Sequence, residues 1–488
     1  MSIEPTARKP NWQAMASSTV SRRDFLGNLA GGLSGIALVD LLATDGALKA
    51  AATSDLPPRH HRPGTQRVIQ IFLQGGLSQV DSFDYKPDLI RHHGQELPAS
   101  EKPDVFGSKI GLLHAPHWTF RQRGESGLWI SDLFPHIAGH ADQLALIRSM
   151  YEASGNHTPA TFIAHCGLNE LGFPTLGAWV LHGLGSVSRD LPGFVVLGDP
   201  RGMPAGGANL WGSGFLPAKH QGVLLQSEGP AVTDLKSFQP ISNATRQSRL
   251  ALLEKINRDH LAARQVNDEL AARMRSYQLA ARMQLAVPEA TSLERETSQT
   301  QKLYGIDQDT TRDFGRMCLL ARRLVERGVR FVQLWSGATL AQPTWDSHED
   351  VVNDHAREAA RIDLPVAGLL SDLQQRGLLD DTLVICTTEF GRTPFAQTEK
   401  GKLGKGRDHN QDGFTSWLAG GGVRGGMSYG ATDPLGFRAI ENPVSVHDFH
   451  ATILHLLGLD HERLTFYHNG LNRRLTNFHG RIIGDILA

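Results

Sequence analysis

Arg67-Val-Ile-Gln-Ile-Phe-Leu73 is the stretch that decides the fold, an apolar run of strand-forming residues stopped by Gly75-Gly76. Such a run is typical of a strand buried on both faces of a sheet. Similar runs follow at residues 144–150, 194–197, 329–334, 383–387 and 414–419. Residues 311–327 and 363–375 have helical apolar spacing, and each stretch ends at a glycine before the next strand. This order predicts an α/β fold, a mainly parallel central sheet with helices on both faces.

The first 52 residues have the character of an export signal. Ser21-Arg22-Arg23-Asp24-Phe25-Leu26 precedes a weakly apolar run rich in Gly and Ala, a pattern that resembles a twin-arginine signal. A membrane anchor is the first alternative, but Asp40 and Asp45 interrupt a run already shorter than the ~20 residues of a membrane span. A chance pair of arginines in a cytoplasmic protein is the second. We expect export to the periplasm or the medium, without a stable membrane anchor.

Two further segments stand apart from the main domain, which we place at residues 67–488. Residues 53–66 are polar and proline-rich, which predicts a linker. Residues 244–303 are rich in Ala, Leu, Arg and Glu and nearly free of glycine, which predicts an α-helical insertion. Such an insertion would cap the fold or make contacts between chains, so an oligomer is one expectation.

The overall composition excludes several classes of protein. Lysine plus arginine (49) nearly balances aspartate plus glutamate (50), so no basic surplus points to nucleic acid. The three cysteines, Cys166, Cys318 and Cys386, are far apart and form neither a zinc motif nor a disulfide ladder. We expect each of them to be a small buried apolar residue.

Four polar segments follow predicted strands, where ligands bind in open α/β sheets. The first is Gln74-Gly-Gly-Leu-Ser-Gln-Val-Asp-Ser-Phe-Asp84, whose glycines allow either a close approach to a ligand or a plain turn. The second is Ser154-Gly-Asn-His-Thr-Pro159, in which Asn156 and His157 could either cap a helix or face a ligand.

The third segment, Trp345-Asp-Ser-His-Glu-Asp350, offers Asp346 and His348 to one cation, with ordinary surface polarity as the alternative. The fourth is Cys386-Thr-Thr-Glu-Phe-Gly-Arg-Thr-Pro394 followed by Gly406-Arg-Asp-His-Asn410. Carboxylate, imidazole and guanidinium suit a site for phosphate or sulfate esters, because arginine binds such anions in a planar fork. A structural salt bridge is the alternative for Arg392.

These motifs in this order resemble a large family of exported bacterial sulfatase-like proteins of unknown function, within the alkaline phosphatase-like superfamily. The similarity runs from about residue 67 to the C-terminus, and residues 444–458 also resemble a late sulfatase helix. The resemblance implies a metal site on Asp346, His348 and His409. It also puts Glu389 where a second site has its carboxylate, as a fourth ligand or a base.

The chain departs from the superfamily pattern at three places. Gln74-Gly75 replaces the aspartate of the opening strand, and Phe390 replaces a metal-binding His or Asn. His157 stands at the nucleophile position, where no cysteine is available for conversion to formylglycine. The resemblance therefore implies one largely intact metal site and a degraded second one.

We therefore expect a metal-dependent hydrolase of phosphate or sulfate esters, acting on a small-molecule or saccharide ester. The expected metal is divalent, with zinc foremost and manganese, calcium or iron as alternatives. His157 would be a ligand, an acid/base or the nucleophile, and the groups predicted to contact substrate are Asn156, Arg392 and Asp408. The alternative is a non-catalytic relative that serves as an exported binding protein.

Overall fold

The computed structural model describes residues 57–98, 109–226, 287–339 and 344–488, together with isolated positions between these ranges. The predicted leader and most of the predicted helical insertion lie outside the described residues. Both stay predictions.

A nine-stranded sheet forms the centre of the molecule, with β1 among its inner strands. In sheet order the strands are β12 (Met427–Tyr429), β4 (Leu144–Tyr151), β11 (Phe414–Ala419), β8 (Thr382–Thr387), β1 (Arg67–Leu73), β7 (Phe331–Ser336), β5 (Phe194–Leu197) and β6 (Val223–Leu225), and β15 (Val444–Ser445) pairs with β4. β1 is parallel to both of its neighbours, β7 and β8. Only β11 runs antiparallel to its partners in this sheet as described. The mainly parallel sheet predicted from the apolar runs is confirmed.

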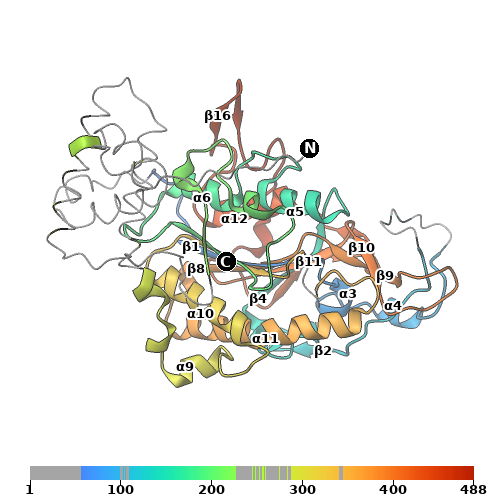
Figure 1. Ribbon diagram of the computed structural model, residues 1–488. Coiled ribbons are helices and arrows are strands. Elements are labelled where there is room, and N and C mark those ends of the chain that lie inside the picture. Colours follow the sequence, from blue (N-terminus) through green and yellow to red (C-terminus); the bar gives the residue numbers. More distant parts are fainter. Residues whose placement is uncertain are drawn as a thin grey trace, which may run out of the picture.

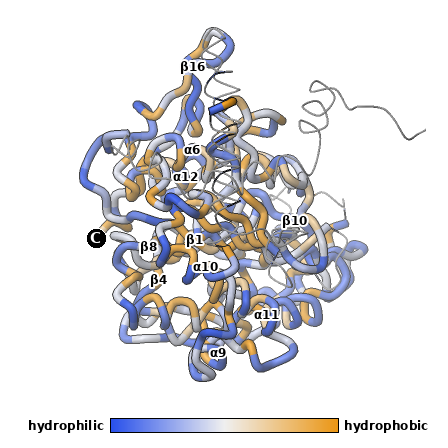
Figure 2. The backbone as a smooth tube through the Cα atoms, turned by 60° about the vertical axis from the view of Figure 1, so that its left-hand side comes forward, coloured by the Kyte–Doolittle hydropathy of each residue, from blue (hydrophilic) through white to orange (hydrophobic). Residues whose placement is uncertain are grey.

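Helices cover both faces of this sheet, as expected for parallel strands whose two faces are apolar. On one face lie α10 (Arg312–Glu326) and α11 (Val351–Gln375), and on the other lie α5 (His157–Cys166), α6 (Leu176–Leu184) and α12 (Val446–Leu456) (Figure 1). Side chains of β1 alternate between the two layers: Ile69 and Ile71 join one core, and Val68 and Phe72 join the other. The hydrophobic strands lie inside the more hydrophilic periphery in Figure 2.

Several elements extend beyond or depart from the predicted ones. α11 begins at Val351 rather than at residue 363, because its polar first half packs beside the site and carries the buried His355. The residues after Glu389 and the residues around His409 form β9 (Gly391–Ala396) and β10 (Arg407–Asn410), an antiparallel pair that the sequence did not predict. Both strands are fully buried, although β10 consists of polar residues alone.

The described part of the predicted linker is hydrogen-bonded to the domain. Gly64 and Thr65 donate backbone hydrogen bonds to the carbonyl of Leu456, at the end of α12. Among the described residues, no helix has both the length and the apolar character needed to cross a bilayer.

Candidate metal centre

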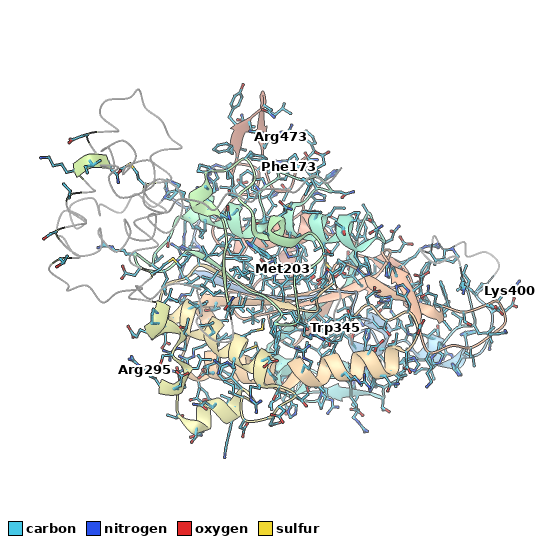
Figure 3. The ribbon with its side chains drawn as sticks, in the orientation of Figure 1. Phe173, Met203, Arg295, Trp345, Lys400 and Arg473 are labelled. Carbon is cyan, nitrogen blue, oxygen red and sulfur yellow. The ribbon has the colours of Figure 1, made fainter. Side chains whose placement is uncertain are left out.

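Three separate parts of the fold bring histidine and aspartate side chains to one place. His157 is the first residue of α5, which follows β4. Asp346 and His348 lie in the segment between β7 and α11, and His409 lies in β10. The neighbouring Trp345 anchors this segment between the sheet and α11 (Figure 3), since its indole is fully buried and donates to Ser336.

The carboxylate of Asp346 is the point on which the three imidazoles converge. Nε2 of His348 lies 2.8 Å from Oδ1 of Asp346, and Nε2 of His409 lies 3.2 Å from the same oxygen. Nε2 of His157 lies 3.1 Å from Oδ2. The four side chains offer ligand atoms that all lie within 4.8 Å of one another. Within the described ranges this is the one group of three or more His, Cys, Asp or Glu side chains that converge in this way.

Each of the three imidazoles has its other ring nitrogen on a hydrogen-bond acceptor. Nδ1 of His157 contacts Oε1 of Glu389 at 2.7 Å, and Nδ1 of His409 contacts the carbonyl of Gly155 at 2.6 Å. Nδ1 of His348 contacts the side-chain oxygen of Gln397. Acceptors at Nδ1 hold the proton there, which leaves the lone pair of Nε2 directed at the common centre.

Glu389 stands behind His157 rather than among the four converging side chains. Its carboxylate is fully buried, and Oε1 also accepts a 2.7 Å hydrogen bond from the backbone N–H of Gly75. The hydroxyl of Thr388 donates to the other oxygen at 3.2 Å. Glu389 therefore orients His157, as carboxylates often do for metal-binding histidines.

Arg392 is fully buried and its guanidinium is engaged on several sides. It donates to Oδ1 of Asp346 at 2.7 Å, to the carbonyl of Gly76 at 3.1 Å and to the carbonyl of Arg407 at 3.1 Å, and also to the carbonyl of Gly75. A guanidinium with no exposed surface and these partners fixes the position of Asp346. Arg392 therefore presents no exposed N–H group for the predicted contact with a substrate anion.

The remaining predicted site residues take different places. Asn156 is exposed at the N-cap of α5, and its side chain makes no capping hydrogen bond. Asp408 is fully buried, accepts a hydrogen bond from the backbone of His409 and lies 3.9 Å from Nδ1 of His348. Asp408 is thus a neighbour of His348 and His409, and it has no exposed surface that a substrate could contact.

The electrostatics of the cluster favour a cation. Burial opposes the charged form of Asp346, but the three imidazoles and Arg392 hold the pKa of its carboxyl well below the usual range. Burial and the charge of Arg392 lower the pKa of His409 to about 3, so this imidazole is neutral at pH 7. Burial also opposes charge on His157, yet Asp346 and Glu389 outweigh it and raise the pKa of His157 to about 9.

Several residues of the site gave no signal in the sequence. Gln397 and the carbonyl of Gly155 are distant along the chain from the histidines that they hold. The ring of Phe390 is fully buried and packs 4.4 Å from the ring of His409 and 4.9 Å from that of His157. An apolar ring thus lies against two of the imidazoles, at the position where the resemblance implied a ligand of a second metal.

Side chains of the Gln74–Asp84 segment form hydrogen bonds to β9 and β10 and are not among the four converging side chains. The side-chain amide of Gln79 donates to the carbonyl of Arg392 at 2.8 Å and accepts from the backbone N–H of Arg392 at 2.9 Å. Asp81 is fully buried and accepts a 2.8 Å hydrogen bond from Nε of Arg407. These contacts fix the β9–β10 pair that carries Arg392 and His409.

Comparison with family models decides the affiliation of the chain. A model described as a protein of unknown function (DUF1501) matches residues 65–487. The chain belongs to the DUF1501 family. This confirms the family of unknown function that the motifs had indicated. None of the curated proteins matches this DUF1501 chain.

Solved structures similar to this DUF1501 chain include sulfatases and phosphatases. The PsFucS1 sulfatase from Pseudoalteromonas sp. shares 14% identity over 91% of this chain and 75% of its own, with a TM-score of 0.36. An alkaline phosphatase from the Antarctic bacterium TAB5 shares 10% over 80% and 98%, with a TM-score of 0.34. The lipoteichoic acid synthase LtaP from Listeria monocytogenes shares 8% over 91% and 79%, with a TM-score of 0.33. These values describe a distant similarity.

Proposed function

We propose that the chain binds one divalent transition metal and uses it to hydrolyse a phosphate or sulfate ester. The observation that supports this proposal is the convergence of three Nε2 atoms on Asp346, each imidazole being held through Nδ1 by an acceptor. Zinc is the metal that a set of three histidines and one aspartate suits best, with manganese and iron as alternatives. Calcium, which prefers oxygen ligands, fits this set poorly.

The donor atoms fit a metal better than they fit one another. Nε2 of His157 is buried and lies 3.1 Å from Oδ2 of Asp346, yet it has no partner in hydrogen-bonding geometry. Two donor atoms about 3 Å apart are placed as two ligands of one metal ion would be. The side chains of His157, Asp346 and His348 are 23%, 33% and 30% exposed, so the ligand set is open on one side.

A metal bound here would supply Lewis-acid polarisation of an ester oxygen. His157 is the first residue of α5, so the N-terminus of this helix lies beside the ligand set. We expect the backbone N–H groups of His157 and Thr158 to contact an anion there, since Pro159 has no N–H. These N–H groups replace Arg392 as the expected contact for the substrate oxyanion. Nδ1 of His157 is held by Glu389 and Nε2 is directed at the common centre, so we assign His157 as a ligand and leave the attack on the ester to water.

The proposed location and substrate of this activity rest on the sequence predictions. We propose export by the twin-arginine route and action on a small-molecule or saccharide ester in the periplasm or the medium. The predicted leader supports this localisation, and the folded metal site is compatible with a route that transports folded proteins.

A non-catalytic metal-binding protein is the second candidate. The burial of Arg392 favours it, because the residue predicted to bind the substrate anion serves Asp346 instead. Metal content alone does not separate the two candidates, but turnover of model esters does.

The test compares Asp346→Asn with the unchanged chain and with a matched surface variant. Asparagine keeps the shape of the side chain but removes the charge, so metal affinity should fall by at least the ~10-fold seen for lesser losses around metal sites. Hydrolysis of aryl phosphates and aryl sulfates should fall with it. Asp309→Ala changes an aspartate that is 92% exposed and forms an ion pair with Arg312, far along the chain from every proposed ligand, so it should change neither metal affinity nor hydrolysis.

Elemental analysis and the two ester assays give the decisive outcomes. Metal and turnover in the unchanged chain, both lost in Asp346→Asn, support the hydrolase. Metal without turnover of either ester class supports the binding protein. A chain that holds no metal, or that keeps it in Asp346→Asn, refutes the metal centre.

A further inference from the structure

A cavity of about 630 Å³ lies beside α5 and α12, outside the four converging ligands. It is lined by the end of β4, the C-terminal end of α5, the start of α12 and residues 478–481. α5 and α12 lie on the same face of the sheet (Figure 1), and His447 in α12 contacts the carbonyl of Gly167 just after α5 at 2.8 Å. Nothing in the metal centre uses these residues.

Glu152 is the unusual group in the lining of this cavity. It is only 6% exposed, and its Oε2 atom is buried without a hydrogen-bond partner, while Oε1 accepts from the backbone of Ala153. Burial raises the pKa of this carboxyl to about 8, so at pH 7 it is mostly neutral and can donate a hydrogen bond. A buried polar atom without a partner costs stability, so a water or a ligand group that reached this oxygen from the cavity would stabilise the protein.

The rest of the lining combines imidazoles with an aromatic rim. The rings of His447 and His479 lie 5.0 Å apart, and both line the cavity. Phe478 and Tyr151 lie at the cavity with 80% and 40% of their surfaces exposed. Exposed aromatic side chains of this size present a flat apolar face to a ligand.

The charges of the lining disfavour a strongly anionic ligand. Arg481 is the cavity's one arginine, and its guanidinium donates to the carbonyl of Pro443, while two carboxylates, Asp448 and Glu462, belong to the same lining. A neutral carboxyl, two imidazoles and aromatic faces instead suit a ring that carries hydroxyl groups and presents C–H bonds to an aromatic plane. We propose that this cavity binds a neutral sugar unit of a carbohydrate.

The loop that leads into α5 connects this cavity with the metal centre. Glu152 lines the cavity, while Gly155, three residues later, accepts the hydrogen bond from His409. A carbohydrate in the cavity would therefore lie along the same loop as the metal ligands. The sugar site itself does not depend on the proposed hydrolysis, because none of its lining residues is a metal ligand.

The experiment measures sugar binding by the purified full chain. The probes are maltotriose, cellotriose, xylotriose and laminaritriose, titrated by calorimetry, with inorganic sulfate and phosphate as the anionic comparison. Phe478→Ala should weaken binding of the recognised trisaccharide about tenfold, the scale of one lost aromatic contact. Tyr467→Ala is the matched control, since Tyr467 is 71% exposed on the hairpin of β16 (Phe466–His468) and β17 (Leu471–Arg473) and lies outside the cavity lining.

A second variant separates a ligand contact from a structural role. Glu152→Leu removes the unpartnered carboxyl, so it should raise the melting temperature while reducing the affinity for the trisaccharide about tenfold or more. Asp346→Asn should leave sugar binding in place, which separates this site from the metal centre. Binding of sulfate or phosphate alone, no binding of any trisaccharide, or binding that Phe478→Ala leaves unchanged would each overturn the proposal.

Discussion

Metal affinity should rise steeply with pH between pH 7 and pH 9. In the metal-free protein Asp346 and Glu389 raise the pKa of His157 from 6.5 to about 9. At pH 7 the neutral form that can bind a metal is therefore about one molecule in a hundred, which costs about 2.7 kcal/mol of binding free energy. The apparent affinity should increase about tenfold for each pH unit up to pH 9 and then level off.

The assay is a zinc titration in competition with a chelator from pH 6.5 to pH 9.5, corrected for the protonation of the chelator and the hydrolysis of zinc. An imidazole with the ordinary pKa would level off near pH 7, so the position of the break identifies the perturbed histidine. Glu389→Gln removes one of the two carboxylates that raise this pKa, and the break should move to lower pH. An affinity that is flat between pH 7 and pH 9 would refute the assignment of His157 as a ligand held between two carboxylates.

Three further predictions concern stability, backbone packing and export. The raised pKa of His157 stabilises the metal-free fold fully below pH 6.5, and this contribution, on the order of 3 kcal/mol, is lost as pH rises through 9. Denaturant unfolding of metal-free protein should therefore show falling stability from pH 7 to pH 10, and a rise would contradict the ion pairs. Gly75 has φ +123°, and a Cβ there would lie 2.3 Å from the backbone nitrogen of Asp346, so Gly75→Ala should destabilise the fold and displace the metal ligand. Gly94→Ala is its control, with φ +78° and open space around it, and should cost about 1 kcal/mol without changing metal binding. Equal loss of metal in both variants would refute the clash with Asp346 as the cause. Changing Arg22 and Arg23 to Lys should abolish export with a folded product left in the cytoplasm, and normal export would exclude the twin-arginine route.

Much of the sheet was predictable because its strands are short apolar runs between breakers. Residues 67–73, 194–197 and 414–419 are strands with the predicted bounds, as β1, β5 and β11. The reversed direction of β11 left no trace in its sequence, since direction depends on the connection and not on the strand. The β9–β10 pair was missed because β9 is short and contains Gly391 and Pro394, while β10 consists of polar residues alone. Phe395 is buried in a cluster with Val80 and Phe437, and Arg407 is buried through its ion pair with the distant Asp81.

The candidate site was partly predictable for a related reason. Asp346, His348 and His409 each follow or flank a predicted strand, so the expectation that polar side chains gather at strand ends pointed to them. The roles of Glu389 and Arg392 could not be read in the same way. A carboxylate can bind a metal directly or accept a hydrogen bond from a metal-binding histidine, and its position differs by about 3 Å between the two roles. The order of residues along the chain does not determine that position.

The register of the β9–β10 pair has a consequence for how this family can vary. Arg392 and His409 are directly opposite each other in that pair, and both reach Oδ1 of Asp346. A shift of one residue in either strand would turn one of them to the other face. The connecting residues 397–406 lie outside the two strands, and only Gln397 among them touches a metal-centre histidine by hydrogen bond. The carbonyls of Lys402 and Lys405 accept backbone hydrogen bonds from Leu112 and Val351. Relatives should therefore tolerate insertions between residues 398 and 401, whereas a single deletion inside either strand should abolish the proposed metal binding.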